Sequence, residues 1–362
     1  MSMWIRAAVT PGRGEPFRIE KVELEDCRPD ELIVDIKAAG ICHTDEAAQM
    51  QQLPVPLPAV LGHEGAGVVA KVGSAVTDFA VGDHVVLSFA SCGKCGPCTE
   101  GRPYACEKMF EMNFCGMMPD GTKRMYWNGQ ALGAFFSQSS FATQCVVKAR
   151  SAVRIDKEID LTVAAPFGCG VQTGAGIVLN CLKPPFGAQL AVFGCGTVGM
   201  AALMAARIAG CKTIIAVGGN AKSLALAKEL GATHTVNRKE VDDIAAAVRE
   251  ITGGGADYVI DTSGVQPMIE AGLEALNYLG TLVMAGAGSV IPPNTALAAK
   301  TVMGVTEGHS VPRAFIPKLL DYYRAGRFPV DKLIRTYPFE EINAAFAASH
   351  RGDVIKAVLK VE

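Results

Sequence analysis

The chain has few charged residues for its length and almost no net charge. Asp, Glu, Lys and Arg make up 19% of its 362 residues, and the formal net charge is −2. This balance gives no electrostatic attraction toward nucleic acid or an anionic membrane, so we expect neither as a partner. Hydrophobic residues make up 49%, which is typical of a well-buried globular protein. A chain of this length usually forms two domains.

The sequence also lacks internal repeats and low-complexity stretches. The residues from Met1 to Arg6 contain no apolar run and no cleavage site, so we expect no signal peptide. The one long apolar stretch, Leu190 to Ala209, contains a glycine cluster and Arg207, which favours a buried strand, turn and helix over a membrane span. We therefore expect a cytoplasmic protein whose 12 cysteines remain reduced.

Four of these cysteines have the spacing of metal ligands. Cys92, Cys95, Cys98 and Cys106 follow the pattern C-x2-C-x2-C-x7-C, and thiolates so close in sequence can converge on one ion. Four sulfurs around a tetrahedral ion describe a closed structural zinc site. A disulfide pair is disfavoured without a secretory context, whereas an iron–sulfur cluster is an alternative that the spacing leaves open.

A second ligand set is dispersed along the chain. Cys42, His63 and Cys169 together supply two thiolates and one imidazole. Three such ligands leave the fourth tetrahedral position of a zinc ion open, which is the catalytic arrangement. Taken alone, Cys42 is better explained as a small buried apolar side chain, and the spacing does not establish that the three residues meet.

The first part of the chain, residues 1 to about 90, has a predominantly β pattern. Short alternating or β-rich runs, ended by turns, indicate a barrel-like or folded sheet. The predicted strands cover residues 31–38, 67–73 and 81–87.

Residues from about 171 to 305 alternate strands with helices. The apolar run 190–193 is followed by the glycine fingerprint and then by a helical run over 200–209. In that position G-x-G-x-x-G is a dinucleotide-binding signature, because the glycines let the backbone approach a pyrophosphate at a helix N-terminus. A strand–helix turn without a ligand is the less favoured alternative. The candidate contacts are Gly194, Gly196, Thr197, Val198 and Gly199.

The alternation after the fingerprint predicts a parallel sheet with helices on both faces. The predicted strands cover 213–217, 257–261 and 280–285, and the predicted helices cover 223–230 and 268–279. The C-terminal part adds a helix near 316–325 and an alternating strand over 354–361.

Taken together, these motifs resemble those of the zinc-dependent alcohol dehydrogenases of the medium-chain dehydrogenase/reductase family, over almost the full length. The features that carry the resemblance are Gly62-His63-Glu64, the four-cysteine lobe, Gly168-Cys169-Gly170 and the fingerprint. Within the family, runs such as Phe136 to Ala142 are most similar to bacterial benzyl (aryl) alcohol dehydrogenases.

The resemblance implies an α/β plus mainly-β architecture. A GroES-like catalytic domain would comprise residues 1–170 and 306–362, with its structural zinc lobe at 91–107. A Rossmann cofactor domain would comprise residues 171–305, with the active site in the cleft between the domains. The resemblance also implies a homodimer or homotetramer, joined near Met284 to Gly288.

The resemblance further implies individual roles. Cys42, His63 and Cys169 would hold a catalytic zinc, the second zinc of each subunit. Glu64 would join the coordination during ligand exchange, Asp45 would orient His63, and Thr44 would take the alcohol proton. His43 and Lys356 would contact the cofactor pyrophosphate, and Thr173 would pack near the nicotinamide.

The sequence departs from the family pattern at two positions. An NAD-preferring fingerprint has an acid roughly 20 residues after the glycines, but that strand ends at Gly218 and Gly219, and no carboxylate occurs from Lys212 to Lys228. NADP is therefore accepted or preferred, although NAD binding through other contacts is the alternative. An arginine determinant is absent from this segment; the candidate donors to a 2′-phosphate are Asn220, Lys222 and Ser223.

The second departure is Ala47, where many members have a proton-relaying histidine. We expect water to replace that relay, since a hydroxyl such as that of Thr44 only passes a proton on. The predicted function is the interconversion of primary aromatic or allylic alcohols and aldehydes, with Phe89, Phe135 and Phe136 as candidate pocket residues. The alternatives are an NADPH-preferring aldehyde reductase and a non-catalytic zinc- and nucleotide-binding regulatory protein.

Overall fold

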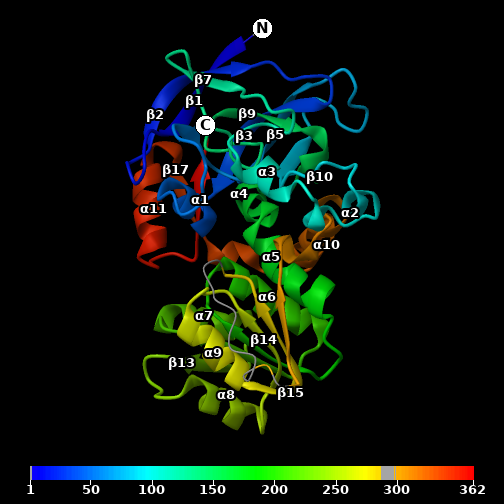
Figure 1. The fold of residues 1–362 in the computed structure, drawn as a ribbon, viewed down its shortest axis with the longest axis vertical. Coiled ribbons are helices and arrows are strands. Elements are labelled where there is room, and N and C mark those ends of the chain that lie inside the picture. Colours follow the sequence, from blue (N-terminus) through cyan, green and yellow to red (C-terminus); the bar gives the residue numbers. More distant parts are fainter. Residues whose placement is uncertain (1, 287–296, 298) are drawn as a thin grey trace. The chain divides into compact units, whose positions relative to one another are not determined.

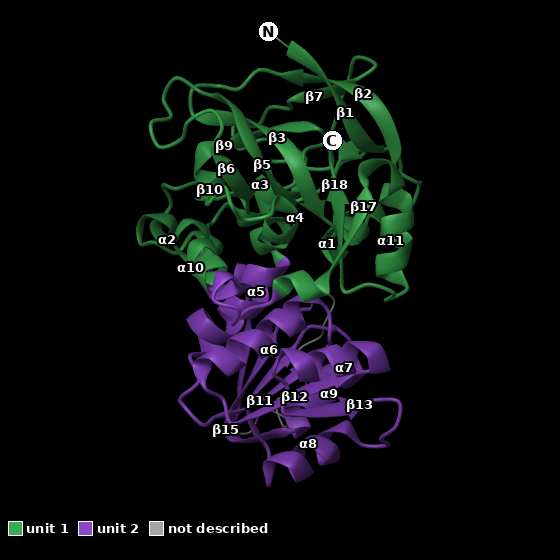
Figure 2. Ribbon diagram, turned by 180° about the vertical axis from the view of Figure 1, so that it is seen from behind, with its two compact units in different colours: residues 1–169, 311–321, 330–362 green, residues 170–310, 322–329 purple. Residues whose placement is uncertain are grey.

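A computed structural model describes residues 2–286, 297 and 299–362 (Figure 1). The chain divides into two compact units (Figure 2). Unit 1 comprises residues 1–169, 311–321 and 330–362, and unit 2 comprises residues 170–310 and 322–329. The expected boundary after residue 170 lies one residue from the observed one, whereas 306–310 and 322–329 belong to unit 2 rather than to the catalytic domain.

Unit 1 contains two sheets whose pairings are mostly antiparallel. One has the strand order β4-β1-β2-β7-β8, and the other has the order β10-β6-β5-β3-β18-β17, with β9 also paired to β3. The bounds are β1 Ser2–Thr10, β2 Arg18–Glu25, β3 Glu31–Gly40, β4 Ala59–Val60, β5 Glu64–Val72, β6 His84–Leu87, β7 Met125–Trp127, β8 Gln130–Ala131, β9 Gln144–Lys148, β10 Ala152–Ile155, β17 Ile334–Pro338 and β18 Lys356–Lys360.

Strand β3 lies at the centre of unit 1. It pairs with β5, β9 and β18, and Leu32, Ile33 and Val34 are all buried, so the strand is covered on both faces. The predicted strand over 31–38 is thus confirmed. Surrounding helices include α1 His43–Gln49, α2 Gly96–Thr99, α3 Met109–Phe114, α4 Leu161–Ala164, α10 Pro312–Arg324, of which residues 312–321 belong to unit 1, and α11 Ile342–His350.

The described strands of unit 2 form one parallel sheet with the order β13-β12-β11-β14-β15-β16. Numbered within the unit, this is the order 3-2-1-4-5-6 of a dinucleotide-binding fold. The strands are β11 Gln189–Phe193, β12 Thr213–Gly218, β13 His234–Asn237, β14 Ala256–Asp261, β15 Leu276–Met284 and β16 Thr301–Gly304, and the helices are α5 Gly170–Gly176, α6 Thr197–Ala209, α7 Ala221–Leu230, α8 Ile244–Thr252 and α9 Gln266–Glu274.

The helix predicted over 268–279 is too long. Helix α9 ends at Glu274, and β15 begins at Leu276, whose partner across the ladder is Ala256. A short apolar run fits a buried helix and a buried strand equally well, and here the pairing with β14 decides. Helix α6 likewise begins at Thr197, inside the fingerprint, and not at Met200.

Two further expectations concern membranes and assembly. Among the described residues, no single helix is long and apolar enough to cross a membrane. One pair of helices, 161–168 and 170–182, is long and apolar enough in total, but the two are bent by 59° relative to each other. The stretch 190–209 is β11 followed by α6. The expected subunit contact near Met284 to Gly288 includes residues 287 and 288, which lie outside the described residues.

Candidate metal centres and cofactor-binding segments

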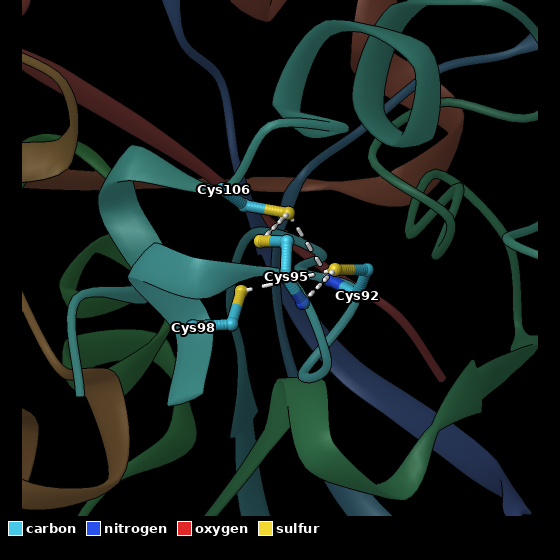
Figure 3. Close-up of side chains that lie close together, drawn as sticks. All are labelled: Cys92, Cys95, Cys98 and Cys106. Atoms are coloured by element: carbon cyan, nitrogen blue, oxygen red, sulfur yellow. Dashed lines mark hydrogen bonds between the residues drawn. The ribbon is translucent and has the colours of Figure 1, made fainter. Parts of the chain in front are cut away.

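The four closely spaced cysteines converge in a small lobe of unit 1 (Figure 3). Their sulfur atoms lie within 4.8 Å of one another. Sγ of Cys92 is 4.0 Å from Sγ of Cys98, and Sγ of Cys95 is 3.9 Å from Sγ of Cys106. These separations exclude disulfides, and they match the edge of a sulfur tetrahedron around zinc, about 3.8 Å when each Zn–S bond is about 2.3 Å.

Backbone amides stabilise negative charge on these sulfurs. The amides of Cys95 and Lys108 each donate to a sulfur at 3.4 Å, and the amide of Cys92 donates to Cys106 at 3.3 Å. Burial raises the pKa of Cys92, but the amide donors outweigh it and lower that pKa to about 6. Burial raises the pKa of Cys98 to about 12. Ionising all four thiols therefore requires a bound cation, which fits a metal site.

A second cluster draws its members from distant segments of unit 1. Cys42, His63, Glu64 and Cys169 place one ligand atom each within 4.8 Å of one another. Cys42 precedes α1, His63 directly precedes β5, Glu64 is the first residue of β5, and Cys169 follows a 3₁₀ turn over 165–168. The structure thus brings together the three residues whose convergence the spacing left open, and it adds a carboxylate.

Asp45 fixes the orientation of His63. Its Oδ1 lies 3.0 Å from Nδ1 of His63 and accepts the Gly62 amide at 3.0 Å, while Oδ2 accepts the Cys42 amide at 2.9 Å. The other ring nitrogen, Nε2, is buried and has no hydrogen-bond partner within the described chain. A buried nitrogen held in this way beside two sulfurs is suited to a metal ion, and the carboxylate–histidine contact is typical of such sites.

The electrostatics of the cluster also suit a cation. A hydrogen bond from Cys169, with support from His63, holds the pKa of Cys42 well below its usual value despite burial. Burial lowers the pKa of His63, but Asp45 and Cys42 more than offset this and raise the pKa well above its usual value. A thiolate and an imidazole nitrogen therefore face the same point, and this set of sulfur and nitrogen ligands fits a zinc ion.

Glu64 forms a buried ion pair with Lys356 of β18. Nζ lies 2.9 Å from Oε2 and 3.1 Å from Oε1, and it donates to the carbonyl of Ile41 at 2.8 Å. Burial raises the pKa of Glu64 to about 7, against the opposing effect of Lys356. The resemblance predicts a phosphate contact for Lys356, but its side chain is 2% exposed and its ammonium group pairs with Glu64. A phosphate contact would require this pair to open.

Aromatic packing holds the His63 ring from two sides. The ring of Phe136 stacks on it with centroids 4.4 Å apart, and Phe135 meets it edge-on at 5.4 Å. Gln138, which sequence reasoning missed because an isolated glutamine has no motif, donates to the His63 carbonyl at 3.0 Å. Phe89, Phe135 and Phe136 all belong to the hydrophobic core of unit 1, and the rings of Phe135 and Phe136 also position His63.

The first turn of α1 carries Thr44 and His43. Oγ1 of Thr44 lies 3.6 Å from Sγ of Cys42, which places this hydroxyl beside the cluster of candidate metal ligands. The side chain of His43 is 82% exposed, with Nδ1 3.4 Å from a carboxylate oxygen of Glu46. The helix itself was not predicted, because it interrupts a region with a β pattern.

The fingerprint forms the turn between β11 and α6. Gly194 has φ +109°, and a Cβ on Gly199 would lie 1.9 Å from the carbonyl oxygen of Gly194. A Cβ on Gly196 would meet nothing within 4 Å, so the backbone is open to a ligand at this point. This is the distribution that a bound pyrophosphate requires. Thr197 and Val198 are the first two residues of α6.

The segment after β12 has no carboxylate. Gly218 ends β12, Gly219 follows it, and Asn220 caps α7. Oδ1 of Asn220 accepts the amides of Lys222 at 2.9 Å and Ser223 at 3.4 Å. This oxygen therefore satisfies the helix N-terminus, as an N-cap residue does.

Thr173 lies in α5, within unit 2. Its hydroxyl is 3.5 Å from Oε2 of Glu307, and the neighbouring Gln172 donates to the same oxygen at 3.4 Å. Ser310 donates to Oε1 of Gln172 at 2.8 Å. Residues 307–310 thus fix the face of α5 on which Thr173 lies.

The comparison with known proteins agrees with this geometry. The family model "Alcohol dehydrogenase GroES-like domain" matches residues 28–157, and the model "Zinc-binding dehydrogenase" matches residues 197–322. Geraniol dehydrogenase of Castellaniella defragrans is 41% identical over 98% of this chain and 97% of its own length. The chain belongs to the zinc-dependent alcohol dehydrogenases.

Solved structures of this family have the same fold. An alcohol dehydrogenase zinc-binding domain protein from Burkholderia ambifaria is 44% identical, covers 100% of both chains and superposes with a TM-score of 0.97. Benzyl alcohol dehydrogenase from Acinetobacter calcoaceticus is 40% identical, covers 99% of this chain and 100% of its own, and has a TM-score of 0.95. The chain is therefore an oxidoreductase with a GroES-like domain and a Rossmann domain. A zinc-dependent family also favours zinc over an iron–sulfur cluster at the four cysteines.

Proposed function

We propose that this dehydrogenase interconverts primary aromatic or allylic alcohols and their aldehydes, with NAD(P) as hydride acceptor. The observation that carries the proposal is the cluster of Cys42, His63 and Cys169, in which the buried imidazole Nε2 has no hydrogen-bond partner among the described residues. The substrate class is supported by two full-length relatives, named as dehydrogenases of geraniol and of benzyl alcohol.

The residues around the cluster would perform the following work. A zinc ion held by Cys42, His63 and Cys169 would lower the pKa of a ligated hydroxyl group, and the nicotinamide would accept the hydride. Asp45 keeps Nε2 of His63 directed toward the metal position by its contact with Nδ1. His63 and Glu64 are buried, and this burial strengthens the electrostatic interactions that they make.

Thr44 would receive the proton that the alcohol loses. Its hydroxyl lies beside Cys42, within reach of a group bound at the same point. A neutral hydroxyl must hand the proton on, and Ala47 cannot accept it. We propose that water carries the proton from Thr44 to solvent, so that Ala47→His changes the pH profile of turnover.

The core positions of Phe89, Phe135 and Phe136 weaken one reason for an aromatic substrate. These rings are 3%, 0% and 4% exposed and pack in the core of unit 1. The substrate class therefore depends on the relatives. We also propose two zinc ions per subunit, one for each ligand cluster, and a homodimer or homotetramer.

The decisive experiment measures kcat/KM for benzyl alcohol, geraniol and ethanol, each with NAD and with NADP, in protein of known zinc content. The proposal expects both unsaturated alcohols to exceed ethanol by about tenfold or more, the discrimination that a few apolar contacts provide. Turnover of ethanol alone would overturn the substrate class. The aldehyde reductase is the second candidate, favoured by the absence of an acid at Gly218, and it predicts faster reduction than oxidation with the phosphorylated cofactor.

A regulatory protein without chemistry, the remaining alternative, is contradicted by the family. The relatives are named as dehydrogenases over nearly the whole chain. A purely structural zinc site would also have no use for a second cluster with an oriented imidazole.

A further inference from the structure

The loop after β12 is the place where a dinucleotide-binding fold distinguishes NAD from NADP. An acid at the end of this strand binds the ribose 2′-hydroxyl of NAD, and a nearby arginine accommodates the 2′-phosphate of NADP. In this chain the strand ends in Gly218 and Gly219, which offer neither group. The chemistry at the site must therefore come from other segments.

Two residues that directly follow strand β13, Arg238 and Lys239, have side chains close to Gly219. A Cβ on Gly219 would be 2.9 Å from Nε of Arg238 and 3.3 Å from Cε of Lys239. A Cβ on Gly218 would be 3.0 Å from Sγ of Cys195, in the fingerprint turn. The absent side chains are thus replaced by one sulfur and two cationic groups.

The sheet register explains how Arg238 reaches this position. Strand β13 pairs in parallel with β12, so Asn237 lies opposite Gly218, and the amide of Arg238 donates to the Gly218 carbonyl at 2.9 Å. The first residue after β13 is consequently fixed at the carboxyl edge of the sheet, beside the end of β12. Sequence reasoning confined to residues 212–228 could not find it.

Both cations are available to a ligand. Arg238 and Lys239 are exposed, and neither forms an ion pair within the described ranges. The closest acid in sequence, Glu240, accepts a hydrogen bond from the side chain of Asn237. Asp243 is engaged as the cap of α8, where its Oδ1 accepts the amide of Ala246 at 2.9 Å.

We propose that Arg238 and Lys239 bind the 2′-phosphate of NADP(H) and make it the preferred cofactor. Arg238 would supply directed donors to the phosphate oxygens, and Lys239 would add a point charge. The inference rests on the proposed function only in taking a nicotinamide dinucleotide as the cofactor. It adds an arginine from outside residues 212–228, the segment in which the sequence has none.

The test measures binding by calorimetry, apart from turnover, with 2′,5′-ADP and 5′-AMP as probes and the full chain as receptor. The wild type should bind 2′,5′-ADP at least about tenfold more tightly than 5′-AMP, since hydrogen bonds to charged groups are individually strong. Arg238→Gln should lower the affinity for 2′,5′-ADP by about 10- to 100-fold and change the affinity for 5′-AMP by less than about threefold. Arg238→Lys should retain part of the preference, and Lys228→Gln, which removes an exposed charge at the other end of α7, should retain all of it.

Equal binding of the two probes by the wild type, or equal losses for both in Arg238→Gln, would overturn the inference. Selective binding of 2′,5′-ADP by a protein that oxidises no alcohol would support the inference while removing the proposed function. The melting temperature of each variant checks that the fold is intact, which an exposed side chain should not disturb.

A converse pair of variants tests the glycine side of the site. Because Sγ of Cys195 occupies the space next to Gly218, Gly218→Asp is best made together with Cys195→Ala. The double variant should shift the ratio of NADP to NAD affinity toward NAD by about tenfold or more, since a carboxylate repels the 2′-phosphate. Cys195→Ala alone is the control, and an unchanged ratio in the double variant would contradict the proposed location.

Discussion

The two ligand clusters of unit 1 are assembled in opposite ways. The cysteines from Cys92 to Cys106 belong to one short lobe, are mostly partly exposed and supply sulfur alone. The cluster of Cys42, His63 and Cys169 draws its members from distant segments, is largely buried and adds nitrogen and a carboxylate. Turns within one short segment bring the ligands of the first cluster together, whereas the second cluster requires the completed sheet.

The difference extends to the surrounding residues. The lobe has only a small apolar core of its own, formed by Ala90, Cys106 and Met112, so a metal must supply much of its stability. The buried cluster is held by Asp45 and by the Glu64–Lys356 pair, and the core of unit 1 does not depend on an ion there. We therefore expect metal loss to unfold one site and to inactivate the other.

The largest effect should follow from removing two lobe ligands, in Cys92→Ser/Cys98→Ser. Structural zinc contributes roughly 10–16 kcal/mol in zinc-finger peptides, and most of that binding energy should be lost here. Metal analysis should show one zinc per chain instead of two, and thermal unfolding should begin at a lower temperature. Cys115→Ser, which alters a free cysteine outside both clusters, is the control. Two zinc ions and an unchanged melting curve in the double variant would refute a structural role.

Cys42→Ser should have the next largest effect, on turnover rather than on folding. Losing a thiolate ligand removes several kcal/mol of charge stabilisation, so kcat/KM should fall by about 10³-fold or more. The melting temperature should stay close to that of the wild type, and one zinc should remain in the four-cysteine lobe. Cys27→Ser, a change outside both clusters, should be fully active. Near-normal turnover of Cys42→Ser would mean that the catalytic site is elsewhere.

Lys356→Met should destabilise unit 1 by about 3–5 kcal/mol at neutral to alkaline pH, since it leaves the Glu64 carboxylate buried without its partner. The pH dependence has a defined sign. Burial raises the pKa of folded Glu64 to about 7 from its usual 4.5, so folding favours the protonated form. Stability should therefore decrease as pH rises through this window, and the loss should be smaller at pH 5 than at pH 8.

Chemical denaturation at those two pH values checks this prediction. The double variant Lys356→Met/Glu64→Gln should recover part of the lost stability, because no charge is left buried. If Lys356→Met lost the same free energy of unfolding at both pH values, or if the double variant were less stable than the single one, packing and not charge would explain the effect.

The contrast between the clusters also explains what the sequence could predict. The four cysteines and the fingerprint are local patterns; the cysteines converge as their spacing indicates, and the fingerprint lies between a strand and a helix. The contact of Glu64 with Lys356 and that of Gly219 with Arg238 depend on strand register between distant segments. A single sequence carries no signal for such register. The end of α9 at Glu274 was misplaced for a related reason, since pairing between strands, and not local composition, ends that helix.

The smallest expected effect separates the two clusters by metal affinity alone. Asp45→Asn would replace an acceptor of three N–H groups with an amide that has only one acceptor oxygen, so the orientation of His63 would loosen. Changes to such partners of metal ligands typically cost 10–100-fold in affinity. In a titration with a chelator, one zinc should therefore leave the variant at a roughly 10–100-fold lower chelator concentration, together with activity, while the other is retained as in the wild type. Asp353→Asn, an exposed position, serves as the control. Two outcomes would contradict the prediction: loss of both ions at the same chelator concentration, or full activity after the first ion has left. Either would mean that the metal affinity of the buried cluster does not depend on Asp45.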